Sequence, residues 1–235
     1  YFLGIRESLK RLTLTDRVTT IGENAFWGCN GLTSIELPSS VTTIRDSAFS
    51  GCFGLTSIEI PNSVTAIGVN AFASCPNLTS VIYNSDAYAD GMFNGCSVSD
   101  LTFGGTAVPD NIAYRLGIRG ALKRLALTDK VITIGEQAFD GCTGLASVEF
   151  SDSITTIGVC AFRDCIGLTS IKIPGSVTTI GDAAFAGCTG LTSIKLPSSV
   201  TTIRDSAFSG CSGLTSIEVP NSVTTIGVNA FASCP

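Results

Sequence analysis

The chain has no histidine, so its ten cysteines are the first residues to consider as catalytic or metal-binding groups. Nine of them stand three residues after a phenylalanine, and eight of those phenylalanines follow an alanine, which gives the string AFxxC. Only Cys160 is off this pattern. A catalytic cysteine needs an activating partner and an accessible thiolate. A residue type that recurs at one repeat position is instead typical of a buried column, so we expect these thiols to act as small apolar side chains.

One pair of carboxylates is the other candidate, either for acid–base chemistry or for holding calcium. Glu36 and Glu59 are at the same position of two successive repeats, and would be about 5 Å apart at the backbone if the repeats stack as strands. The alternative is two exposed carboxylates on a solvated sheet. The chain has no CxxC pair, no HExxH motif and no phosphate-binding glycine loop. We therefore predict no enzymatic activity, no metal and no cofactor.

The element that must position these residues is a repeat with a period of 23 residues. A typical unit is LTSIELPSSVTTIRDSAFSGCFG, residues 32–54. The alternation in LTSIEL predicts a half-buried strand, VTTI predicts a second short strand, and DSAFSGC predicts a turn that Gly51 ends. One unit cannot bury its own apolar face, so stacked units should form a solenoid. The string LxxIxI or an apolar variant of it starts at residues 9, 32, 55, 78, 98, 122, 145, 168, 191 and 214.

The whole pattern, LxxIxIPxxVxxIGxxAFxxCxxL, resembles the BspA-like (treponeme-type) leucine-rich repeats found in surface proteins of bacteria and of some mucosal protists. The resemblance covers nearly the whole chain. It implies an α/β repeat fold, a leucine-rich-repeat solenoid of about ten 23-residue coils with a parallel sheet on one face and short second strands and turns on the other. It also implies adhesion to host proteins or to other cells, an extracellular or cell-surface location, and no shared catalytic residue.

Groups of repeats are themselves duplicated. The segment GIRESLKRLTLTDRVTTIGENAF at residues 4–26 returns as GIRGALKRLALTDKVITIGEQAF at residues 117–139. Residues 45–76 return at residues 204–235 with three differences. Duplication of whole modules explains both matches.

We accordingly predict a first leucine-rich module at residues 1–76, an irregular connector at residues 77–116 that continues the solenoid and is partly helical, and a second module at residues 117–235. Tyr1 and Pro235 both fall inside the repeat pattern. We therefore expect one continuous solenoid that is a piece of a longer array.

The third and fifth residues of each LxxIxI string should face solvent on the main sheet. Most of them are serine or threonine, so the charged and apolar exceptions are what a partner could recognise. The alternative is a face that serves only solubility. The candidate ligand-binding residues are Arg11, Glu36, Glu59, Ile82, Arg124, Glu149, Lys172, Lys195 and Glu218 on this stripe, with Tyr83 and Tyr88 from the connector.

Composition narrows the choice of partner. The net charge is -5 and charged residues make up 14% of the chain, which argues against a nucleic-acid binder. No stretch approaches the roughly 18–20 apolar residues of a membrane span, so we expect no membrane insertion of this segment. We predict a protein partner, such as a host matrix or cell-surface protein. The alternative is a structural protein that associates with itself end to end in an extracellular filament or surface layer.

Overall fold

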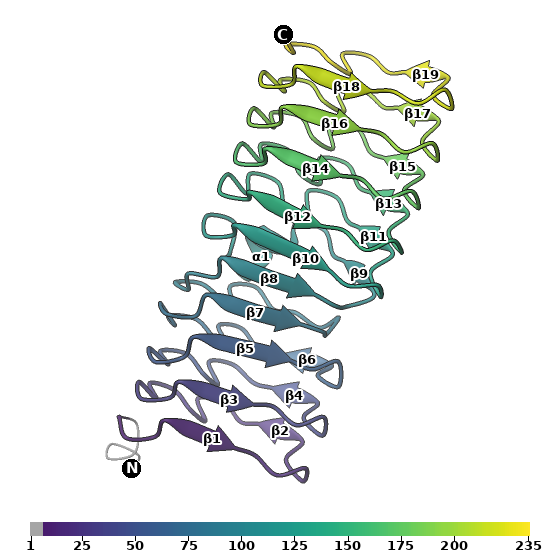
Figure 1. Ribbon diagram of the computed structural model, residues 1–235. Coiled ribbons are helices and arrows are strands. Elements are labelled where there is room, and N and C mark those ends of the chain that lie inside the picture. Colours follow the sequence, from purple (N-terminus) through teal and green to yellow (C-terminus); the bar gives the residue numbers. More distant parts are fainter. Residues whose placement is uncertain (1–6) are drawn as a thin grey trace. The chain divides into compact units, whose positions relative to one another are not determined.

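The computed structural model describes residues 7–235, in which short parallel strands follow one another coil by coil (Figure 1). Each main strand begins two residues after the start of an LxxIxI string, as the alternation predicts. The main strands are β1 (Arg11–Thr13), β3 (Ser34–Glu36), β5 (Ser57–Ile60), β7 (Ser80–Tyr83), β8 (Asp100–Phe103), β10 (Arg124–Leu127), β12 (Ser147–Glu149), β14 (Ser170–Lys172), β16 (Ser193–Lys195) and β18 (Ser216–Glu218). The predicted solenoid of 23-residue coils is confirmed. Tyr1, which falls inside the repeat pattern of the sequence, lies outside the described residues.

A second, two-residue strand follows nearly every main strand and starts the other side of the coil. These strands are β2 (Thr20–Ile21), β4 (Thr43–Ile44), β6 (Ala66–Ile67), β9 (Ala107–Val108), β11 (Thr133–Ile134), β13 (Thr156–Ile157), β15 (Thr179–Ile180), β17 (Thr202–Ile203) and β19 (Thr225–Ile226). The region of the predicted connector departs from this rule. The coil after β7 has no second strand, and the helix α1 (Ile112–Leu116) takes the place of an AFxxC turn.

The described chain divides into two compact units. Unit 1 contains the residues up to Gly105 together with Arg115–Ala121, and unit 2 contains Thr106–Tyr114 together with Leu122–Pro235. The division falls in and after the predicted connector. The boundaries of the duplicated modules stay a prediction from the sequence.

Within each unit the parallel register places equal repeat positions side by side. In unit 1, Thr13 of β1 lies opposite Glu36 of β3. In unit 2, Lys172 of β14 lies opposite Lys195 of β16, which in turn lies opposite Glu218 of β18. Side chains at one repeat position therefore form a column along neighbouring strands, and a substitution at that position changes one member of the column.

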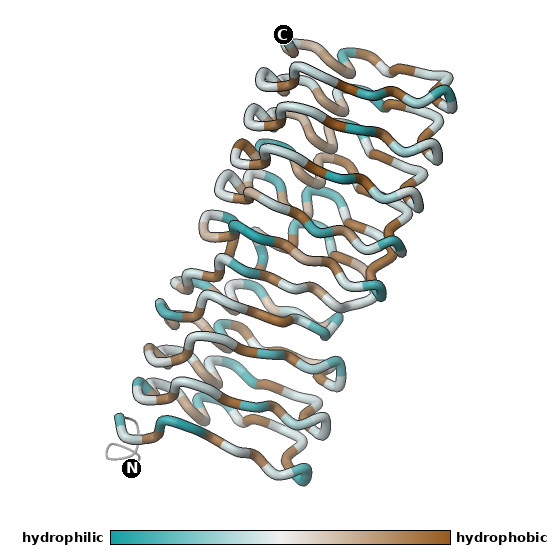
Figure 2. Tube along the Cα trace, viewed as in Figure 1, coloured by the Kyte–Doolittle hydropathy of each residue, from teal (hydrophilic) through white to brown (hydrophobic). Residues whose placement is uncertain are grey.

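The core of each unit contains a column of stacked phenylalanine rings. In unit 1 the ring centroids of successive members are 5.1 to 5.7 Å apart, and in unit 2 they are 5.5 to 5.6 Å apart. Apolar residues of the main strands, of the second strands and of the turns make up the rest of the core (Figure 2). The stacked rings are Phe26, Phe49, Phe72 and Phe93 in unit 1, and Phe139, Phe162, Phe185, Phe208 and Phe231 in unit 2.

The cysteines form a second column beside the phenylalanines. All ten are free thiols, seven are buried, and Cys96, Cys160 and Cys234 are partly exposed. The expected burial is confirmed for seven of the eight cysteines in AFxxC strings, and Cys234 is the exception. The structure adds that these thiols are hydrogen-bond donors: the Cys52 Sγ donates to the Phe26 carbonyl oxygen of the preceding coil at 3.2 Å, and the same bond recurs at 3.1 to 3.3 Å along both units.

The turn before each Ala-Phe pair needs a left-handed backbone, which sequence reasoning did not anticipate. The residue that precedes the alanine has φ between 51° and 56°. Asparagine and glycine adopt this conformation more readily than other residues do. The position also explains Cys160, which stands at this turn and not in the cysteine column. The left-handed residues at this turn position, directly before the alanine, are Asn24, Ser47, Asn70, Gln137, Cys160, Ala183, Ser206 and Asn229.

Ala183→Asn should stabilise the chain by roughly 0.5–1 kcal/mol, because asparagine tolerates the left-handed region better than alanine does. Ala183 has φ of 51° and is partly exposed, so the larger side chain can reach solvent. Urea denaturation followed by circular dichroism measures the change. The matched control is Ala184→Asn, which puts an amide at a fully buried neighbouring position and should destabilise. Equal effects of the two variants would contradict the explanation.

Candidate functional site

The predicted stripe is exposed as expected. Seven of the ten main strands bury their central apolar residue and turn the residues on either side outward: in β3, Ile35 is buried between Ser34 and Glu36. The central residue is partly exposed in β1, β12 and β18. In β16, Ile194 is buried and Lys195 is exposed. All nine stripe candidates are exposed, namely Arg11, Glu36, Glu59, Ile82, Arg124, Glu149, Lys172, Lys195 and Glu218.

Tyr83 is not available to a ligand, so its prediction as a binding residue is wrong. It is 1% exposed, its ring stacks on Phe103 with the centroids 5.6 Å apart, and its hydroxyl donates to the carbonyl oxygen of Ala87. Burial raises the pKa of this phenol. The signal was present in the sequence: Tyr83 is the sixth residue of LTSVIY, and period-2 alternation puts it on the same buried face as Val81.

Tyr88 is partly exposed and belongs to a small cluster in unit 1. The guanidinium carbon of Arg115 lies 4.5 Å from the centre of the Tyr88 ring, and the Arg115 Nη1 donates to the Tyr88 hydroxyl at 2.8 Å. The Arg115 Nε also pairs with Asp90 at 2.8 Å. These contacts fix the orientation of the ring, and ligand binding by Tyr88 stays a prediction.

The stripe of unit 1 contains an acidic groove, which we define by Glu36 and Glu59. The groove has a volume of about 420 Å³, and serines from the neighbouring strands line it together with Ile82. The Nδ2 of Asn84 donates to the Glu59 Oε1 at 3.1 Å. Among residues 7–235 no group of three histidine, cysteine or acidic side chains is arranged to hold a metal ion.

The stripe of unit 2 contains a lysine groove, which we define by Lys172 and Lys195. Its volume is about 700 Å³, and Ser170, Ser193 and Glu218 line it. The Lys195 Nζ lies 2.7 Å from the Glu218 Oε2, and this hydrogen bond raises the pKa of Lys195.

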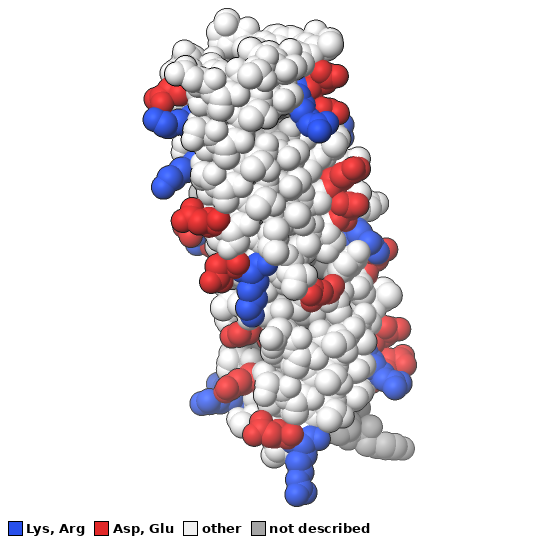
Figure 3. All heavy atoms as spheres, turned by 90° about the vertical axis from the view of Figure 1, so that its right-hand side faces the viewer, with Lys and Arg blue, Asp and Glu red and all other residues white. Residues whose placement is uncertain are grey.

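On the face shown in Figure 3, charged side chains gather in bands along both flanks and leave a largely uncharged surface between them.

A comparison of duplicated coils shows where the two grooves differ. Residues 32–54 and residues 191–213 are identical except at two positions. Glu36 is replaced by Lys195, and the half-exposed Phe53 is replaced by Ser212. Every core residue of the coil is unchanged, so the duplication kept the fold and reversed the charge on the stripe. Sequence reasoning missed this reversal, although the two aligned coils contain it.

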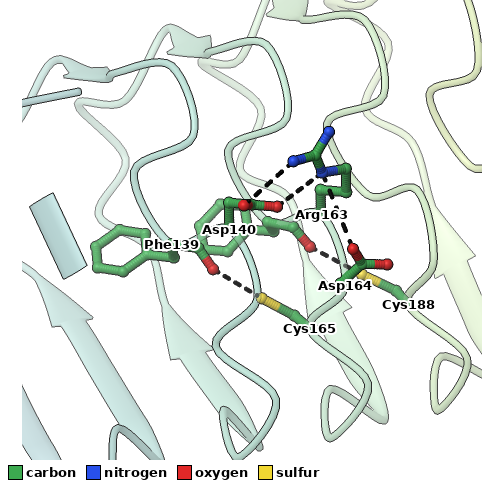
Figure 4. Close-up of polar contacts among 7 residues, drawn as sticks. Phe139, Asp140, Arg163, Asp164, Cys165 and Cys188 are labelled. Carbon is green, nitrogen blue, oxygen red and sulfur yellow. Dashed lines mark hydrogen bonds and ion pairs between the residues drawn. The ribbon is translucent and has the colours of Figure 1, made fainter. Parts of the chain in front are cut away.

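The turns on another side of unit 2 form a cluster that holds successive coils together (Figure 4). The Arg163 Nε and Nη2 donate to the two carboxylate oxygens of Asp140 in the preceding coil at 2.7 and 3.2 Å. The Arg163 Nε also lies 3.9 Å from the Oδ2 of Asp164. Beside this pair the Cys165 thiol donates to the Phe139 carbonyl oxygen at 3.3 Å. The polar groups of this cluster have hydrogen-bond partners within the chain, so we assign the cluster a structural role. The stripe is therefore the candidate binding surface.

No helix in the described part of the chain combines the length and the apolar character that a membrane crossing requires.

Solved structures similar to this chain are bacterial leucine-rich repeat proteins. A leucine rich cell surface protein from Faecalibacterium prausnitzii is 34% identical over 97% of this chain and 64% of its own length, with a TM-score of 0.50. A leucine-rich repeat protein from Bacteroides ovatus is 26% identical over 97% of this chain and 77% of its own, with a TM-score of 0.53. This chain therefore spans less than two thirds of the Faecalibacterium protein. No similar sequence was found among functionally curated proteins.

The family comparison covers almost the whole chain. The profile of the BspA type leucine rich repeat region matches residues 2–114 and 119–235, in six copies. The matched segments contain all ten main strands and both grooves. On this match the chain belongs to the BspA-type leucine-rich repeat proteins.

Proposed function

We propose that the chain is a non-enzymatic protein-binding array of a cell surface, and that its partner binds along the exposed stripe of the main strands. The observation that carries the proposal is the coincidence of groove and stripe: in each unit a groove opens on the third and fifth positions of neighbouring strands. A groove with an apolar floor and a few charged side chains suits a protein segment that docks by shape and is oriented by charge.

The proposed location and the proposed adhesive role rest on similarity. The Faecalibacterium relative is described as a cell surface protein, and it shares 34% identity with this chain. A rigid sheet that presents variable side chains on an unchanging core is a suitable scaffold for adhesion, because exposed residues can change without loss of the fold. The host matrix and host cell surface supply the protein partners that such a scaffold would meet.

Lys172→Glu with Lys195→Glu should weaken binding of a partner at the lysine groove at least tenfold, because reversing two charges turns attraction into repulsion. We would screen immobilised matrix and cell-surface proteins for binding and compare the two chains by surface plasmon resonance. The control is Lys130→Glu with Arg204→Glu, which makes the same change of net charge in unit 2 at exposed positions off the stripe. Equal loss in the two variants, or no loss in either, would place the binding surface elsewhere.

A further inference from the structure

The acidic groove and the lysine groove have their charges at the same spacing along the sequence. Glu36 and Glu59 are 23 residues apart at one repeat position, and so are Lys172 and Lys195. The two lysines lie directly opposite each other on paired parallel strands. Glu36 and Glu59 are on the successive strands β3 and β5, which lie in contact but belong to different hydrogen-bonded sheets. Stacked strands are about 4.8 Å apart, so a pair of glutamates and a pair of lysines at equal repeat positions can meet in register.

The side chains beside the charges allow two such faces to approach. The third position of the LxxIxI string is serine throughout both grooves. The column next to the charges therefore consists of small hydroxyl side chains. Small side chains leave room for long ones from an opposing face, and their hydroxyls can donate to carboxylates or accept from ammonium groups. These serines are Ser34, Ser57 and Ser80 in unit 1, and Ser170, Ser193 and Ser216 in unit 2.

The residues at the ends of each charge pair favour pairing of unlike grooves. Thr13 and Ile82 flank the two glutamates, while Glu149 and Glu218 flank the two lysines. When the acidic groove faces the lysine groove, in either strand direction, both flanking glutamates meet an uncharged residue. Two acidic grooves, or two lysine grooves, would instead place like charges opposite each other in register, which is destabilising.

We propose that the stripe recognises a second copy of this chain, with the acidic groove of unit 1 in one copy bound to the lysine groove of unit 2 in the other. The inference rests on the proposed function in that both use the stripe. It accounts for the single charge reversal, Glu36 to Lys195, between coils that otherwise differ only at a half-exposed turn residue. Without the reversal, one glutamate of the acidic groove would meet a second glutamate in either strand direction.

The pairing has two physical consequences. The contact joins different surfaces of two identical chains, so each bound pair keeps one free acidic groove and one free lysine groove and can add further copies. The ion pairs are exposed, and salt screens such charges over a Debye length of about 10 Å at 0.1 M. Association should therefore be weak, should grow with concentration, and should decrease as salt increases.

Sedimentation velocity of the purified chain, with no other protein present, tests the proposal. We expect association that rises with protein concentration at about 10 mM salt, where the Debye length is about 30 Å, and that falls at least tenfold at about 1 M, where it is about 3 Å. A chain that sediments as a monomer at every concentration in low salt would overturn the proposal. Binding of other proteins is measured separately as above, so failure of self-association and failure of partner binding are distinct results.

Charge-reversed variants show whether the grooves are the surfaces in contact. Glu36→Lys with Glu59→Lys makes both grooves basic, and Lys172→Glu with Lys195→Glu makes both acidic. Each variant alone should be monomeric, an equal mixture of the two should associate, and the four changes combined in one chain should restore self-association. Lys130→Glu with Arg204→Glu, the control off the stripe, should associate like the original chain.

Persistence of self-association in the two single-sign variants would overturn the groove pairing. It would point to contact at other surfaces, such as the end-to-end stacking expected as an alternative from the sequence. Circular dichroism of each variant confirms that the fold is intact, which is expected because all four side chains are exposed.

Discussion

Phe162→Ala should destabilise unit 2 by about 3–5 kcal/mol, the usual cost of removing a large buried aromatic side chain. Phe162 is fully buried, and its ring stacks on Phe139 and Phe185 with centroids 5.5 Å apart on either side. A third ring, Phe150, meets it edge-on at 5.9 Å. The substitution removes all three ring contacts and leaves a cavity in the middle of a stack, where neither adjacent coil can move in without losing its own partner.

Chemical denaturation followed by circular dichroism measures this loss, and hydrogen exchange shows whether it is greatest in the coils around Phe162. The matched control is Phe53→Ser. Phe53 is 50% exposed, and the duplicated coil already has serine at this position, Ser212. Surface changes of this kind are usually within about 0.5 kcal/mol. A loss below about 1 kcal/mol in Phe162→Ala would mean that the ring column contributes little to stability.

Raising the pH from about 9 to about 12 should unfold the chain, because the buried thiol column resists ionisation. The hydrogen bond with the neighbouring Cys52 thiol, together with burial, raises the pKa of Cys75 to about 12. Burial raises the pKa of Cys211 to about 12 as well, and burial raises that of Cys165 and Cys188 in the same direction. An unfolded thiol ionises near its ordinary pKa of 9.0.

The sign follows from proton binding in the two states. Above pH 9 the unfolded chain loses thiol protons that the folded chain keeps, so the stability that these thiols contribute is complete below pH 9 and is lost as the pH rises toward the folded pKa. Each column thiol that ionises only on unfolding should lower the free energy of unfolding by about 1.4 kcal/mol per pH unit.

Denaturation curves recorded in steps from pH 8 to pH 11 test this expectation. Cys211→Ala should have a shallower dependence on pH than the original chain. Cys160→Ala is the control, because Cys160 stands outside the column at a turn where alanine occurs in another coil, at Ala183. A slope that is the same in both variants would show that other groups, and not the thiol column, cause the alkaline unfolding.

The repeat pattern contains the information for the strands and for the burial of Tyr83, but not for the two grooves. The 23-residue period and the alternation of apolar residues predicted every main strand and the exposed side of each, because burial in a strand alternates with period 2. The same alternation predicts that Tyr83 is buried, but the irregular loop around it drew attention to its aromatic ring as a surface feature. The change from Glu36 to Lys195 can be read from the sequence. Only the strand register shows that these two residues belong to two different grooves.

The local pattern of this chain dictated the repeat unit, its strands and its apolar interior, because each depends on residues that are close together along the coil. The contacts between coils followed from packing and could not be found by inspecting one unit. The Cys52 thiol donates to a carbonyl oxygen 26 residues earlier, and the Asp140 carboxylate binds an arginine 23 residues later. Three features depend on the distance between coils, which is defined only once the coils have stacked. They are these hydrogen bonds, the left-handed turns that allow them, and the placement of like charges side by side on neighbouring strands.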